Sequence, residues 1–147
     1  MSLPFVSRAL LPFLAALPLF ATAAQPVVEV YKTASCGCCK QWIKHLEENG
    51  FSVKAQDVAN PGDYRAKFGI ADAHGSCHSA RVAGYAIEGH VPASDIKRML
   101  ATRPEATGLA VPGMPMGSPG MEGAHSDPYE VLLVKKDGST GVYKRYR

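Results

Sequence analysis

The pattern of apolar and polar positions predicts a strand followed by a helix early in the chain. The run VVEVY at 27–31 is rich in β-branched residues, which is typical of a strand. Four apolar positions then recur at the i, i+3, i+4 and i+7 spacing of one helical face: Cys39, Trp42, Ile43 and Leu46. Gly50 marks the end of this helix, because glycine is favoured just beyond a helix C-terminus.

The next two segments predict a second strand and a second helix. FSVKAQDV at 51–58 places apolar residues at every second position, which indicates a second strand. NPGDYRAKFG at 60–69 offers Asn60 as the N-cap and Pro61 as a first-turn residue of a short helix.

Further along, RVAGYAIEG at 81–89 is predicted to be one buried strand. A helix opened by Pro92 is predicted to end before Pro104. The stretch at 108–128 is rich in glycine, proline and methionine and is predicted to be a long loop. Two apolar runs around an Asp-Gly turn predict a C-terminal β-hairpin at 129–146.

This order of short strands and helices indicates an α/β sandwich around a small mixed sheet. Three cysteines stand where the first strand meets the first helix, as in the thioredoxin-like fold. We therefore expect a thioredoxin-like domain, with the long loop and the C-terminal hairpin as additions.

The first 24 residues have the pattern of a secretory signal peptide. Arg8 precedes an apolar run at 9–20, and small residues up to Ala24 suit cleavage. The run is short for a membrane span, which needs roughly 20 residues, so an uncleaved anchor is the less favoured alternative. Cleavage would leave one domain at 25–147, in an exported protein that does not insert into the membrane.

Charge adds little to this interpretation. The formal net charge is +3, and one unit less without Arg8, which gives no electrostatic argument for nucleic-acid binding. Export has a larger effect on the interpretation of the cysteines, because an oxidising compartment permits disulfides.

Three of the four cysteines lie in the segment SCGCCK at 35–40. Cys36 and Cys39 have the C-x-x-C spacing of a redox dithiol, and Cys38 lies between them. Thiols at the first turn of a helix are stabilised as thiolates by free N–H groups and the helix dipole. A thiolate serves disulfide exchange and soft-metal binding equally, so the segment alone leaves both open.

The fourth cysteine favours a metal. Cys77 stands beside His78 in the loop before the predicted third strand, which in a thioredoxin-like fold faces the first helix's N-terminus. Thioredoxins usually place a metal-excluding cis-proline there, and this sequence has no proline near. Thiolates and thioethers select Cu(I), and the long loop carries Met114, Met116 and Met121, followed by His125.

The other histidines carry weaker signals. His45 lies off the apolar stripe of the first helix, which favours a solvated position. His90 is interpreted either as a residue supporting the site or as a turn residue, and His74 is a marginal candidate.

Three segments together resemble the CopG-like family of exported proteins associated with bacterial copper resistance: YKTASCGCCKQWIKHLEENGF, SCHSARVAGYAIEGHVP and GLAVPGMPMGSPGMEG. The resemblance extends from about Val27 to the final hairpin. It implies a thioredoxin-like fold, a periplasmic location, and several copper ions bridged by the four cysteine thiolates. It also implies a proposed change between Cu(I) and Cu(II), which leaves open whether the protein turns over as an enzyme.

We therefore expect a copper-binding protein that acts by sequestration or redox cycling, with other periplasmic copper-resistance proteins as partners. The expected core ligands are Cys36, Cys38, Cys39 and Cys77. The expected auxiliary ligands, or residues on a path to the site, are His78, Met114, Met116, Met121 and His125.

Two alternatives stay open. A thiol–disulfide oxidoreductase would use Cys36 as the attacking thiolate and Cys39 as the resolving thiol. A structural zinc site made by the four thiols would make folding depend on the metal, and would leave the methionines unexplained.

Overall fold

A computed structural model describes residues 26–147 of the chain. The expected signal peptide at 1–24 lies outside the described residues. Among the residues described, no helix has the length and apolar character needed to cross a membrane.

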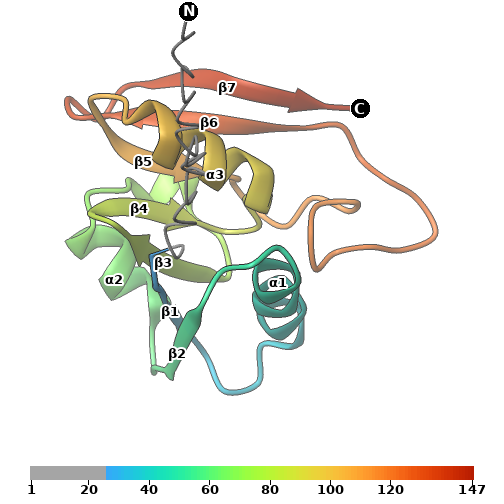
Figure 1. Cartoon of the computed structure of the whole chain (residues 1–147). Helices are drawn as coiled ribbons and strands as arrows, with labels where there is room; N and C mark the ends of the chain where they lie inside the picture. The colour runs from blue at the N-terminus through green and yellow to red at the C-terminus, as the bar shows by residue number, and fades with distance from the viewer. Residues whose placement is uncertain (1–25) are drawn as a thin grey trace, which may run out of the picture.

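One mixed sheet of seven strands organises the fold (Figure 1). The strands in chain order are β1 (Val28–Lys32), β2 (Val53–Asp57), β3 (His78–Val82), β4 (Tyr85–Glu88), β5 (Ala106–Ala110), β6 (Tyr129–Lys135) and β7 (Thr140–Tyr146). Their order across the sheet is β2-β1-β3-β4-β5-β6-β7. The β1–β2 and β4–β5 pairs are parallel, and the other four pairs are antiparallel.

Three helices cover the two faces of the sheet. They are α1 (Gly37–Glu48), α2 (Pro61–Lys67) and α3 (Ala93–Thr102), and a short 3-10 turn, η1 (Asp72–His74), precedes β3. The larger apolar core joins Trp42 and Leu46 of α1 and Ile96 of α3 to one sheet face. A smaller cluster around Ile70 and Ala86 lies on the α2 face.

The predicted class of fold is confirmed: an α/β domain with a mixed sheet, a long loop and a C-terminal hairpin. The stripe of Trp42 and Leu46 faces the core, as its helical spacing predicts. The side chain of Asn60 caps α2 by accepting a hydrogen bond from the Gly62 N–H at 3.0 Å. Gly138 adopts a positive φ of 83° in the β6–β7 turn, where glycine is favoured.

The prediction of one strand at 81–89 is wrong. The segment is the antiparallel hairpin β3–β4, turned by Ala83 and Gly84 with φ of 47° and 88°. Two successive positive φ values are the signature of a tight hairpin turn.

The predicted start of the long loop, at residue 108, is also wrong. Residues 106–110 form β5. Gly108 is needed within this strand, because a Cβ there would clash with the backbone of Ala86 on β4. The loop begins only after Ala110.

Candidate metal centre

Three cysteines surround the N-terminus of α1. Cys36 is its N-cap residue and has extended backbone angles, and Cys38 and Cys39 lie in its first turn. No side chain caps this helix end. Its free N–H groups and its dipole therefore favour negative charge on the thiols placed there.

Cys77 reaches the same place from the loop before β3. In the antiparallel β1–β3 pair, His78 is the partner of Lys32, the last residue of β1. Cys77 therefore lies beside the strand end from which the chain turns into α1. This confirms the prediction that its loop faces the helix N-terminus.

The four sulfur atoms form one cluster, in which all lie within 4.8 Å of one another. The Cys36 and Cys38 sulfurs are 3.6 Å apart. The Cys77 sulfur lies 3.7 Å from that of Cys38 and 3.6 Å from that of Cys39. Sulfurs at these separations are close enough to bind shared metal ions.

A disulfide joins Cys36 to Cys39, while Cys38 and Cys77 are free thiols. In this oxidised form two of the four sulfurs are not thiolates. A site that uses all four thiolates therefore requires reduction of the Cys36–Cys39 bond.

Two buried histidines extend the sulfur cluster. The Cys77 sulfur lies 3.4 Å from His78 Nδ1 and 3.1 Å from His90 Nε2. These three ligand atoms form a second close group that shares Cys77 with the first. His78 packs on the Trp42 ring with the ring centroids 4.3 Å apart. Its buried Nε2 has no hydrogen-bond partner among the described residues.

The hydrogen bond at the other nitrogen of His90 defines its tautomer. His90 Nδ1 lies 2.8 Å from the carbonyl oxygen of Pro119, so Nδ1 carries the proton and donates it. The lone pair of Nε2 then points toward the Cys77 sulfur. Histidines that bind metals commonly donate their second nitrogen to a carbonyl in this way.

Sequence reasoning did not include His90 among the expected ligands. Its neighbours in the chain give no sign of proximity to Cys77, because the contact arises from the β3–β4 hairpin. That hairpin returns the chain to the end of the sheet from which it started. Recognition of Ala83–Gly84 as a turn would have placed His90 beside His78.

Burial controls protonation in this cluster. It raises the pKa of the Cys77 thiol to about 12, with the nearby Cys38 as a second cause. Burial, followed by the neighbouring His90, lowers the pKa of His78 to about 3. At neutral pH the metal-free site therefore holds a protonated Cys77 and a neutral His78, and a metal ion that binds Cys77 as a thiolate releases its proton.

The long loop between β5 and β6, coloured orange in Figure 1, contacts α1 and His90 through Gly120 and Pro119. A Cβ on Gly120 would come within 2.8 Å of the Cys38 carbonyl oxygen and 2.7 Å of the Trp42 nitrogen. Only glycine permits so close an approach at the positive φ of 86° found there. Pro119 is buried, and its carbonyl oxygen accepts the His90 hydrogen bond.

The loop residues expected as ligands have varied environments. Met116 and Met121 are half-buried, whereas Met114 is 51% exposed. The His125 side chain is 67% exposed and lies 3.9 Å from Asp127. The two close groups of ligand atoms among residues 26–147 do not include His125. These four residues therefore stay predictions.

The solvated position predicted for His45 is wrong. The side chain is half-buried, and its Nε2 accepts a hydrogen bond from the Ala93 N–H at 3.1 Å. This bond links α1 to the first residue of α3. Burial lowers the pKa of His45, which favours the neutral ring that can accept this bond.

We expect His45 to make folding stability depend on pH. Because its folded pKa lies below the unfolded value near 6.5, its stabilising contribution is complete above that value. The contribution declines as the pH falls from about 6.5 toward the folded pKa. H45Q retains an acceptor without this titration, so its free energy of unfolding should decrease less between pH 7 and pH 5. Urea unfolding at several pH values measures this, and equal pH slopes in both proteins would contradict it.

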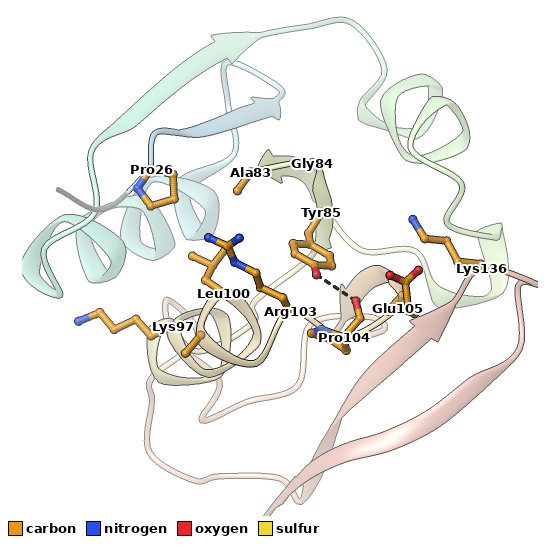
Figure 2. A pocket seen from close by; sticks show the side chains of 12 residues that line it. Pro26, Ala83, Gly84, Tyr85, Lys97, Leu100, Arg103, Pro104, Glu105 and Lys136 are labelled. Atoms are coloured by element: carbon orange, nitrogen blue, oxygen red, sulfur yellow. Dashed lines mark hydrogen bonds between the residues drawn. The ribbon is translucent and has the colours of Figure 1, made fainter. Parts of the chain in front are cut away.

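The described residues also form a surface pocket of about 780 Å³, shown in Figure 2. Ala83, Gly84, Tyr85 and Arg103 are among its lining residues. It lies at the β3–β4 turn, which is the end of these strands away from Cys77 and His90. It contains no cysteine, histidine or methionine, so it is not the metal centre.

Comparison with known proteins identifies the family. Residues 74–121 match the family described as "Protein of unknown function, DUF411". Two solved structures named copper resistance protein CopG, Form 2 and Form 1, are each 44% identical to this chain. Their TM-scores are 0.79 and 0.78, and the matches cover 84% and 83% of this chain and 99% and 98% of theirs.

This chain belongs to the CopG family. Residues from the three motifs that carry the resemblance meet at one site in the structure. The copper-resistance relatives and the cluster of four cysteines both fit copper binding. A comparison with curated proteins found no match.

Proposed function

We propose that this protein binds copper in the periplasm as Cu(I), held by the thiolates of Cys36, Cys38, Cys39 and Cys77. The observation that carries this proposal is the grouping of four sulfurs within 4.8 Å. Thiolates are the ligands that Cu(I) prefers, and bridging allows a few sulfurs to serve several ions. The signal-peptide pattern supports export, and the relatives named for copper resistance support the choice of metal.

His78 and His90 are proposed to complete the site through the nitrogens that face Cys77. Met114, Met116, Met121 and His125 are proposed as auxiliary ligands or as a path by which copper reaches the cluster. Other periplasmic copper-resistance proteins are the proposed partners for delivery and removal of copper.

The Cys36–Cys39 disulfide supports a redox step within the same proposal. Two Cu(II) ions would each take one electron from the Cys36 and Cys39 thiolates, one sulfur–sulfur bond would form, and two Cu(I) ions would result. A dithiol reductant would then reduce the disulfide and restore both thiols. Each cycle would thus reduce two Cu(II) ions to Cu(I), with the electrons supplied by the dithiol reductant.

The same disulfide favours a second candidate function, thiol–disulfide exchange. Cys36 would attack a substrate disulfide, and Cys39 would resolve the mixed disulfide. This activity needs neither Cys38 nor Cys77. It should therefore survive their replacement by serine in an insulin-reduction assay, whereas copper binding should not.

The proposed function is tested by anaerobic loading of the reduced protein with Cu(I), followed by competition with a Cu(I) chelator. We expect several tightly bound ions per chain, because four thiolates and two neutral imidazoles converge on one place. Loading of the oxidised protein is the matched control and should give fewer ions. At most one weakly bound ion in the reduced protein, together with insulin reduction, would support the exchange function instead.

A further inference from the structure

A buried carboxylate, Glu88 at the end of β4, organises the loop that carries Cys77. Its side chain is 1% exposed and accepts hydrogen bonds from three donors. The Ser76 N–H donates to it at 2.8 Å, the Ser79 hydroxyl at 2.6 Å and an Arg65 Nη1–H at 3.3 Å. A buried charge with partners from three segments fixes those segments relative to one another.

Arg65 connects Glu88 to the turn that precedes Cys77. Its Nε and Nη2 donate to Asp72 Oδ1 at 3.1 and 2.9 Å, while Nη1 donates to Glu88. The guanidinium packs directly over Gly75, where a Cβ would come within 2.8 Å of Arg65 Cζ. Arg65 therefore contacts Asp72 and Gly75 directly, and it is linked to Ser76 through Glu88.

Ser76 passes this restraint to the long loop. While its N–H binds Glu88, its hydroxyl donates to the Gly113 carbonyl. The Gly113 N–H donates in return to the Gly75 carbonyl at 2.9 Å. The residue next to Cys77 is thus fixed both to the sheet and to the start of the loop that covers the site.

We propose that Arg65 and Glu88 are positioning residues that hold the Cys77 sulfur against Cys38 and His90 and thereby set the copper affinity of the site. This inference rests on the proposed function for its copper-binding consequence. The restraint itself requires no metal.

Glu88 does not act as a direct ligand in this arrangement. Its carboxylate is absent from the close groups of ligand atoms found among residues 26–147. It belongs to the face of the sheet covered by α2, where it meets Arg65, whereas His78 packs on Trp42 of α1 on the opposite face. Glu88 would therefore affect copper binding through its hydrogen bond with the Ser76 N–H, which fixes the residue before Cys77.

The test begins with E88Q, which keeps the shape of the side chain but removes its charge. We expect Cu(I) binding about 10- to 100-fold weaker than in the wild type, as is usual when a residue supporting a metal ligand is changed. The near-ultraviolet bands of the thiolate–copper complex should shift, because the geometry at Cys77 changes. E130Q is the matched control, since Glu130 accepts from Arg145 at 2.8 Å in a partly exposed pair.

Two further variants separate the effect of side-chain geometry from the effect of charge at Glu88 and Arg65. E88D keeps the charge but is one methylene shorter, so it cannot reach Ser76 with the same geometry. R65K keeps the positive charge but loses the forked contact with Asp72 and Glu88. We expect weaker copper binding in both, and wild-type affinity in all three variants overturns the proposal. These two variants also provide the test if E88Q does not fold.

A measurement without copper distinguishes this inference from the proposed function. In the metal-free protein with the Cys36–Cys39 disulfide intact, Cys38 and Cys77 are the free thiols, so labelling by N-ethylmaleimide is followed at Cys77 by mass spectrometry of its peptide. Cys77 should react several-fold faster in E88Q than in the wild type, because its loop opens more readily. If the wild type binds no copper but Cys77 shows this change, the proposed function fails and the positioning role holds. An unchanged reaction rate in E88Q and R65K overturns the positioning role.

Discussion

Replacement of Cys77 by serine is expected to reduce the copper bound by the reduced protein by about half or more, because a hydroxyl is a poor ligand for Cu(I). Cys77 is shared by both close groups of ligand atoms, one with the other cysteines and one with His78 and His90. Its loss therefore removes a bridge between the two groups. The measurement is copper per chain after anaerobic loading and chelator competition.

The C77S variant should fold normally, because serine has nearly the same shape and the position is only half-buried. Circular dichroism and thermal unfolding check this. The matched variant is C38S, which removes a different free thiol from the same cluster and should also reduce copper binding. Wild-type copper stoichiometry in C77S would contradict the proposed cluster.

The location of the cysteines could be predicted from the sequence, because local patterns determine it. The apolar stripe containing Trp42 and Leu46 predicts α1, and SCGCCK then falls at its N-terminus. These two inferences require only helical periodicity. The prediction that the Cys77 loop faces this helix N-terminus rests in addition on analogy with the thioredoxin-like fold.

The remaining features depend on tertiary contacts that local patterns do not reveal. Ala83 in a left-handed conformation turns a hairpin where alanine would normally continue a strand. Gly108 indicates a loop by composition, yet it lies in β5, where glycine is needed because the backbone of β4 approaches so closely. The proximity of His90 to Cys77, and the restraint of Ser76 by Glu88, both follow from the pairing of β3 with β4. Sequence reasoning that missed the hairpin therefore also missed the residues that support the site.

Trp42 connects the core of the protein to the metal centre. It is fully buried in the larger apolar core, its Nε1–H donates to the Val91 carbonyl at 2.9 Å, and its ring packs on His78. We expect W42A to lower the free energy of unfolding by about 3–5 kcal/mol, because it leaves a cavity and removes that hydrogen bond. The melting temperature should fall by about 10 °C or more in a domain of this size.

W42F separates these two contributions, because phenylalanine fills much of the space but cannot donate to Val91. Its loss of stability should be smaller, about 1–3 kcal/mol. V142A is the control, since Val142 is 44% exposed and its truncation should change stability by less than about 0.5 kcal/mol. Trp42 is the only tryptophan, so unfolding must be followed by circular dichroism or calorimetry. A W42A protein as stable as V142A would show that α1 is not held on the sheet by this side chain, and His78 would then need another support.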